Sequence, residues 1–235
     1  MSRLHRLLPW LGIEAHPVTH RERFAAALGG CLAILVLFAA SHLFLPAPAA
    51  LPVVASMGAS AVLLFALPHS PLAQPWPMLG GHVLSALVGV SCARLVADPL
   101  LAGALAVGCA IGAMHYLRCL HPPGGATALV SVIGGPAIAG LGYGFVLAPV
   151  ALNAFMLVLC AVVYNGLLPW RRYPAYAQHR AVIALAGEPP AIRHEDFVYA
   201  LSELDTYVDV SEDDLLRIYA LATGRAGAHA RHDQA

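Results

Sequence analysis

The hexapeptide GASAVL at residues 58–63 is repeated, with small changes, as GATALV at residues 125–130. Both copies lie in a stretch of the chain that is almost free of charge. Between residues 24 and 170 the charged side chains are Arg94, Asp98 and Arg118. Small and hydroxyl side chains repeated in an apolar background indicate a membrane protein with internal symmetry, whose binding site lies where the two copies face each other.

The composition places the chain in the membrane class. Charged residues make up 11% and hydrophobic residues 59% of the 235 residues, whereas a soluble domain has about 25% charged residues. The formal net charge is zero, so nothing favours binding to nucleic acid. Charged residues before the first apolar run argue against a cleavable signal peptide, and we therefore expect the first span to direct membrane insertion.

The apolar runs sort into two sets of three. The first set covers residues 24–45, 51–67 and 79–96, and the second covers residues 100–117, 126–138 and 143–168. Each set holds a long run, a shorter run that contains glycine, and another long run. We predict an all-α polytopic membrane protein over residues 24–170, built from two repeats of three helical elements. In each repeat the first and third elements are long, and the second is short or broken.

Two topologies fit this pattern. Six spans would place the second repeat upside down relative to the first, as in inverted-repeat transporters, whereas four spans with two re-entrant segments would make the copies parallel. In both cases the chain ends are expected on the cytoplasmic side, because arginines flank the apolar block: Arg3, Arg6, Arg21, Arg23, Arg171, Arg172 and Arg180. The expected location is the cell inner (plasma) membrane.

The segments outside the apolar block are expected to be cytoplasmic. Residues 1–23 form a short N-terminal segment, and residues 171–235 form a tail of soluble composition. The tail is predicted to hold two short helices, over residues 194–205 and from Ser211 to about Gly224. Two such helices are too small for a core of their own, so we expect them to pack on each other, on the membrane part or on a partner.

The second hexapeptide follows the sequence HPPGG at residues 121–125. The prolines end the preceding helix and suit the first turn of a new one, and Gly124 and Gly125 permit a close approach to a ligand. The new helix would point its free N–H groups and the positive end of its dipole into that space. We predict that a small anion binds there to backbone, with the Thr127 hydroxyl as a further donor.

The first copy offers matching chemistry in Ser56, Gly58 and Ser60. Two helix N-termini that meet near the midplane would hold a small anion without a buried arginine. The alternative is that the small residues only permit close packing of helices in the membrane. The break at residues 121–125 favours a binding site, because packing does not need a broken helix.

Polar side chains at membrane depth are candidates for function by default. His82 and His121 lie at helix breaks, where a neutral imidazole could donate to the anion or carry a proton with it. The alternative is an interfacial histidine bonded to a backbone carbonyl. Asn153 lies deep in the last span, and its alternative role is an interhelical hydrogen bond. No HxxxH or HExxH spacing occurs within residues 24–170, so we expect no metal site there. We also expect no cofactor and no catalytic residue.

The run HPPGGATAL at residues 121–129 resembles the signature of the HPP family of integral membrane proteins, which is named for that tripeptide. The sequences GASAVLLF at residues 58–65, SPLAQP at 70–75 and GGH at 80–82 are also similar to blocks of that family. The family is usually described with four membrane spans. Plant chloroplast and cyanobacterial members are implicated in nitrite transport, so the resemblance implies nitrite or a similar small anion as the substrate.

The predicted function is a transporter or channel for a small inorganic anion, with nitrite as the first candidate. The expected partners are this anion and the lipid bilayer, and the small-residue faces are compatible with a homodimer. Two other classes stay open: a membrane scaffold or sensor that acts through its tail, and, less favoured, an intramembrane enzyme. The enzyme would need a nucleophile–base pair such as Ser60 with a histidine, which the sequence does not place together. The predicted substrate-binding residues are Ser56, Gly58, Ser60, His82, His121, Gly124, Gly125, Thr127 and Asn153.

Overall fold

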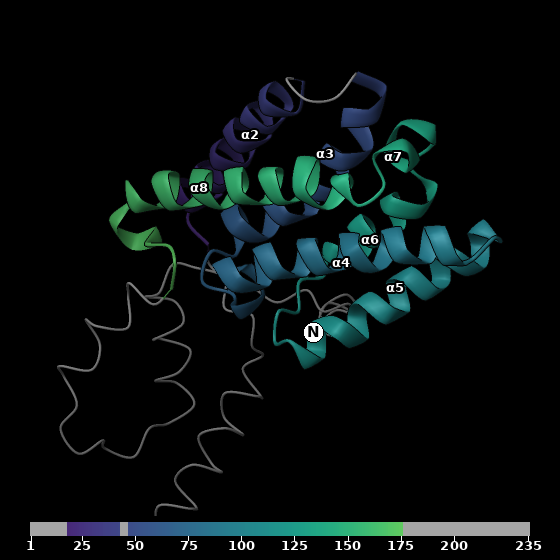
Figure 1. The fold of residues 1–235 in the computed structure, drawn as a ribbon. Coiled ribbons are helices and arrows are strands. Elements are labelled where there is room, and N and C mark those ends of the chain that lie inside the picture. The colour runs from purple at the N-terminus through teal and green to yellow at the C-terminus, as the bar shows by residue number, and fades with distance from the viewer. Residues whose placement is uncertain (1–17, 43–46, 176–235) are drawn as a thin grey trace, which may run out of the picture. The chain divides into compact units, whose positions relative to one another are not determined.

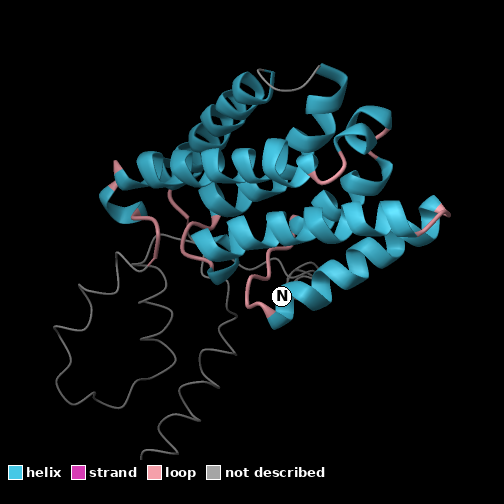
Figure 2. Cartoon of the chain, in the orientation of Figure 1, coloured by secondary structure: helices cyan, strands magenta, loops and turns pink. Residues whose placement is uncertain are grey.

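The computed structural model describes residues 18–42 and 47–175, so the predicted tail helices lie outside the described residues. The described residues from 24 onward belong to one compact unit. The described residues form helices joined by turns, and no strand occurs among them (Figure 2). The prediction of an all-α fold is therefore confirmed.

The helices follow one another with short connections (Figure 1). Two one-turn 3₁₀ helices, η1 and η3, and a π-helical turn, η2, lie among them. In chain order the elements are α2 (His20–His42), α3 (Ala47–Ala66), η1 (Pro71–Ala73), α4 (Pro75–Leu95), α5 (Pro99–Tyr116), α6 (Gly124–Ile133), α7 (Pro136–Leu141), η2 (Val146–Ala151), α8 (Leu152–Gly166) and η3 (Pro169–Arg171).

Proline sets where several of these helices begin. Pro75, Pro99 and Pro136 occupy the first turns of α4, α5 and α7, where the missing N–H and the fixed φ cost nothing. Asp98 caps α5, because its carboxylate accepts a hydrogen bond from the backbone N–H of Leu101 at 2.7 Å. The chain is therefore divided into helices where the sequence places its proline-rich turns.

The described part holds four helices that are long and apolar enough to cross a membrane: His20–His42, Pro75–Leu95, Pro99–Tyr116 and Val146–Gly166. The middle element of each predicted repeat corresponds to a shorter apolar helical stretch, Val53–Ala66 in the first and Gly124–Ile133 in the second. With ten residues, α6 extends about 15 Å, half of a bilayer core of about 30 Å. The protein is thus a multi-pass membrane protein, while the repeat arrangement remains a prediction.

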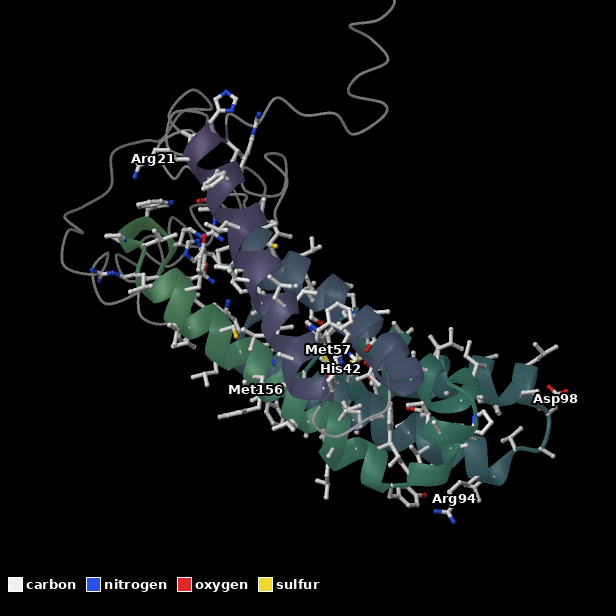
Figure 3. All side chains as sticks on the ribbon, turned by 90° about the horizontal axis from the view of Figure 1, so that it is seen from above. Arg21, His42, Met57, Arg94, Asp98 and Met156 are labelled. Atoms are coloured by element: carbon white, nitrogen blue, oxygen red, sulfur yellow. The ribbon has the colours of Figure 1, made fainter. Side chains whose placement is uncertain are left out.

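The outer faces and the ends of the described helices fit this assignment. Large apolar side chains are exposed, among them Phe24 at 69% and Leu100 at 84%, which water would disfavour and lipid accommodates. Figure 3 shows the charged side chains of Arg94 and Asp98 at one end of the helices, away from Met57 of α3. The interior around α3 therefore lies apart from these charges.

Two of the predicted runs are settled in detail by the structure. The first short run, residues 51–67, was predicted to be either a short or a broken helix, and α3 passes through Gly58 as one helix. A single glycine inside a helix costs only about 1 kcal/mol, which the packing of α3 outweighs. The last run, residues 143–168, was expected to be continuous, but the backbone leaves helical geometry at Ala148, immediately before Pro149. Proline excludes the helical conformation from the residue before it, so the run divides into η2 and α8.

Helix α4 packs closely on α5 and α6 because glycines remove side chains from the contact. A Cβ on Gly81 would lie 2.5 Å from the Cβ of His121, and one on Gly89 would lie 2.5 Å from the carbonyl oxygen of Ala128. A Cβ on Gly124 would lie 2.6 Å from the Oγ of a serine on α4. The small residues thus do bring helices together, and in doing so they press the segment at residues 121–124 against α4.

Arg171 of η3 is a buried cation that the sequence suggested only as a flanking charge. Its side chain is 1% exposed and donates to the carbonyl oxygen of Phe65. Its Nε also donates to the Oδ1 of Asn165 at 3.1 Å, and the Nδ2 of Asn165 donates to the carbonyl oxygen of Leu64 at 3.1 Å. These bonds satisfy carbonyls at the C-terminal end of α3, where the helix dipole favours a positive charge.

Candidate functional site

The hydroxyls of the two repeated hexapeptides meet at one histidine. Ser60 lies on α3, Thr127 on the first turn of α6, and His82 on α4 between them. The Nε2 of His82 lies 2.7 Å from the Oγ of Ser60, and its Nδ1 lies 2.7 Å from the Oγ1 of Thr127. Ser60 and Thr127 occupy matching positions in the two hexapeptides. The two copies therefore face each other across His82.

A second imidazole joins the same serine. The Nε2 of His121 lies 2.8 Å from the Oγ of Ser60, and its Nδ1 lies 2.9 Å from the carbonyl oxygen of Leu72 in η1. The two rings are 4.9 Å apart between centroids and inclined by 60°. We call the four connected side chains, His121, Ser60, His82 and Thr127, the hydroxyl–imidazole cluster.

The hydroxyl–imidazole cluster is enclosed and internally bonded. Ser60, His82 and His121 have no exposed surface, and Thr127 is 1% exposed. Beyond the cluster, the Oγ of Ser56 lies 3.3 Å from the Oγ1 of Thr127, and Ser56 donates to a carbonyl of its own helix at 2.8 Å. A buried hydroxyl without a partner costs about 1–3 kcal/mol, so these mutual bonds are what makes the burial tolerable.

The cluster carries no formal charge. Helices α3 and α6 and the turn η1 contain no Asp, Glu, Lys or Arg. Burial away from any carboxylate disfavours a charged imidazole, and neutral rings satisfy every bond of the cluster. No group of three or more His, Cys, Asp or Glu side chains within the described ranges is placed to hold a metal ion.

The backbone N–H groups that were predicted to hold the anion are not free in the structure. The N–H groups of residues 124–127 each donate to a carbonyl of residues 121–123, at 2.8–3.3 Å. The tight turn formed by the two prolines supplies these acceptors, so the N-terminus of α6 is already satisfied. Gly58 lies in the middle of α3, where its N–H belongs to the helix ladder. The donors that remain as candidates are side chains.

The three predicted glycines also have other roles. A Cβ on Gly58 would meet no atom within 4 Å, so this residue faces open space rather than the cluster. Gly125 is half-buried, with the nearest atom to its Cβ position, on Val107, at 3.9 Å. Gly124 is buried against α4 and serves close packing. None of them contributes a side chain or a free N–H to the cluster.

Asn153 does not join the cluster either. Its Nδ2 donates to the Oγ of Ser41 at 2.9 Å, and the Ser41 hydroxyl donates back to its Oδ1 at 3.2 Å. Both side chains are buried, and the pair connects α8 with α2. The interhelical hydrogen bond that was the alternative interpretation of Asn153 is the one observed.

Two features of the site were not accessible to sequence reasoning. The carbonyl oxygen of Leu72 orients His121. Every residue has a backbone carbonyl, so the amino-acid sequence cannot indicate which one will do this. The sequence also did not place Ser60 beside a histidine, whereas the structure places it between two. Of the predicted binding residues, Ser56, Ser60, His82, His121 and Thr127 come together, and Gly58, Gly124, Gly125 and Asn153 do not contribute to the cluster.

Comparison with known proteins supports a membrane family. Residues 15–174 match the family described as HPP, transmembrane region. A transmembrane protein of Dictyostelium discoideum is 36% identical over 173 residues, which is 71% of this chain and 55% of the relative. A second transmembrane protein of that organism is 42% identical over 127 residues, 52% of this chain and 44% of the relative. The chain thus spans about half the length of these relatives. No solved structure matches it.

Proposed function

Since the chain belongs to the HPP transmembrane family, we propose that it carries a small inorganic anion, with nitrite as the first candidate, across the cell inner membrane. The observation that carries this proposal is the hydroxyl–imidazole cluster, buried among helices that are apolar enough to cross a membrane. Polar groups are costly at such depth, and where they occur they usually mark a transport pathway or a relay.

The chemistry of the cluster suits an anion better than a cation. Its side chains supply O–H and N–H donors, and no carboxylate stands near them to repel a negative charge. A lysine or arginine at this depth would bind an anion tightly and slow its release. Neutral donors exchange one hydrogen bond for another, and transport needs binding that is weak enough to reverse.

The enclosure of the cluster favours alternating access over an open channel. None of the three central side chains, Ser60, His82 and His121, has exposed surface. An anion therefore reaches them only when the helices around them separate. The short α6 and the kinked junction of η2 with α8 are the elements best suited to such a movement, because neither is a straight helix across the full core.

A second candidate function rests on Ser60 and His121. A serine hydroxyl 2.8 Å from an imidazole whose other nitrogen is held by a carbonyl has the arrangement of a nucleophile, its base and an orienting group. Transport is favoured because the N–H groups nearest this serine on α6 are already bonded and offer no oxyanion hole. An active-site phosphonate probe would label Ser60 only if the enzyme interpretation holds.

The proposed function is tested by a flux screen of the purified full chain in proteoliposomes. Nitrite, nitrate, formate and chloride are each offered outside, at equal concentration and a pH near 7, and uptake is compared with that of protein-free liposomes. We expect nitrite uptake clearly above the protein-free background. Chloride should be the poorest substrate, because the other three anions each have two or more oxygen atoms that accept hydrogen bonds and chloride has none. Uptake equal to the background for every anion would contradict the proposal.

A further inference from the structure

We propose that the hydroxyl–imidazole cluster is a proton relay, so that the anion crosses together with a proton. The inference rests on the proposed function and adds the coupling ion to it. It starts from the continuity of the cluster: His121, Ser60, His82 and Thr127 are joined by three contacts of 2.8, 2.7 and 2.7 Å. Each link is short enough for a proton to pass along the hydrogen bond.

The carbonyl of Leu72 fixes the direction of every bond in the neutral cluster. A carbonyl only accepts, so the Nδ1 of His121 carries the hydrogen and its Nε2 is the acceptor. Ser60 must then donate to that Nε2, which leaves its oxygen to accept from the Nε2–H of His82. The Nδ1 of His82 in turn accepts the hydroxyl hydrogen of Thr127, which therefore serves His82 at 2.7 Å rather than Ser56 at 3.3 Å. The bonds among the four side chains all point toward Leu72.

This order allows one extra proton to pass without a charged serine or threonine at the end of the step. A proton from hydronium forms a new O–H bond on Thr127 while the original Thr127 hydrogen moves to the Nδ1 of His82. The Nε2 hydrogen of His82 moves to the oxygen of Ser60, and the Ser60 hydrogen moves to the Nε2 of His121. One bond forms and one breaks at each oxygen, and the product is a His121 imidazolium. Once the helices have opened to the opposite side, the reverse sequence returns the proton from Thr127 to a water molecule there, which becomes hydronium.

The surroundings permit one charge and oppose a second. The group that faces each imidazole is the other imidazole, 4.9 Å away between ring centroids, so two imidazolium ions would repel each other. No Asp, Glu or Lys occurs in α3, α4, α5, α6, α8, η1 or η2 to hold a proton in their place. The other titratable side chains of these elements and of the connection before α6 are Cys92, Arg94, Cys109, His115, Tyr116, Arg118, Cys119, Cys160 and Tyr164.

Imidazole is the side chain that suits such a relay. It can accept a proton on one nitrogen and give one from the other, and its charge changes within the physiological pH range when its surroundings permit. A buried imidazole needs partners at both nitrogens in any role, and both rings have them. What packing alone does not require is that the two rings share a single hydroxyl, which joins them into one continuous path. The relay accounts for this shared hydroxyl.

The test measures anion and proton uptake together in proteoliposomes that contain a trapped pH indicator and valinomycin with potassium to clamp the voltage. For the wild-type chain we expect nitrite uptake to be accompanied by proton uptake. The variant His121→Gln keeps a polar amide but cannot become a cation, and we expect its proton uptake to fall by roughly tenfold or more. The matched control is His115→Gln, because His115 is exposed on α5; its proton uptake should equal the wild-type value.

Each outcome separates the relay from the proposed function. Nitrite uptake by the wild-type chain without proton uptake overturns the relay and leaves the transporter. Wild-type proton uptake in His121→Gln also overturns the relay. If the wild-type chain takes up no anion, the transporter fails, and an acid pulse without anion tests the relay alone: proton uptake equal to that of protein-free liposomes overturns it. Should His121→Gln not fold, Ser60→Ala against Ser60→Thr asks the same question, and an equal proton uptake in both overturns the relay.

Discussion

The variant His82→Leu is expected to lose nitrite uptake by roughly tenfold or more while the chain still folds. Leucine fills a similar volume but offers neither nitrogen, so the hydroxyls of Ser60 and Thr127 lose the partner that they share. Ser60 keeps its bond to His121 and Thr127 can bond to Ser56, so the fold persists, but the link through His82 between the two repeated hexapeptides disappears. The measurement is initial nitrite uptake in proteoliposomes at matched protein content.

The control for this variant is His115→Leu, because His115 is exposed on α5 and lies outside the cluster. Its uptake should match the wild-type value. A second variant, His82→Gln, retains a polar group near the Nε2 position and should keep part of the activity through Ser60. Wild-type uptake in His82→Leu would show that the link across His82 is not needed for transport.

The variant Gly81→Ala is expected to destabilise the fold by about 1–3 kcal/mol, the usual cost of overpacking. Its new Cβ would lie 2.5 Å from the Cβ of His121 and 3.0 Å from the carbonyl oxygen of Cys119, and neither atom is the end of a flexible side chain. The connection before α6 must therefore move away from α4, which also displaces the imidazole of His121. The midpoint of thermal unfolding in detergent should fall.

The matched control is Gly108→Ala on α5, where a Cβ would meet no atom within 4 Å. Alanine stabilises a helix by about 1 kcal/mol relative to glycine, so the unfolding midpoint of this control should rise or stay constant. The two substitutions are chemically identical and differ only in what the methyl group touches. A midpoint that shifts equally in both variants would contradict the close packing of α4 against residues 119–121.

Most of the fold could be predicted because span length and proline are direct physical signals. A run of apolar residues long enough to cross a bilayer has few alternatives to a helix, and prolines confine the ends. Two details needed the folded chain. The sequence left open whether residues 51–67 form a broken helix, and packing holds α3 together through Gly58. It did not indicate the kink in residues 143–168, where the backbone leaves helical geometry at Ala148, before Pro149.

The site was predicted by residue type and not by geometry. Ser60, Thr127, His82 and His121 were selected because polar groups are costly in a membrane, and that argument needs no coordinates. The bonding of the N–H groups at the start of α6 was not foreseen, because the turn at residues 121–123 supplies its own acceptors only once it is folded. The burial of Arg171 against the end of α3 was also out of reach, since only the folded chain brings residues 65 and 171 together.

The measurement that tests the central claim most directly is nitrite uptake by Ser60→Ala and Thr127→Val, which remove one hydroxyl from each repeated hexapeptide. Their control is Ser131→Ala, since the Ser131 hydroxyl is buried on α6 but bonds only to a carbonyl of its own helix, at 2.9 Å. We predict uptake at the protein-free background for the first two variants and at the wild-type value for the control. Wild-type uptake in both Ser60→Ala and Thr127→Val, with folding intact, would contradict the account.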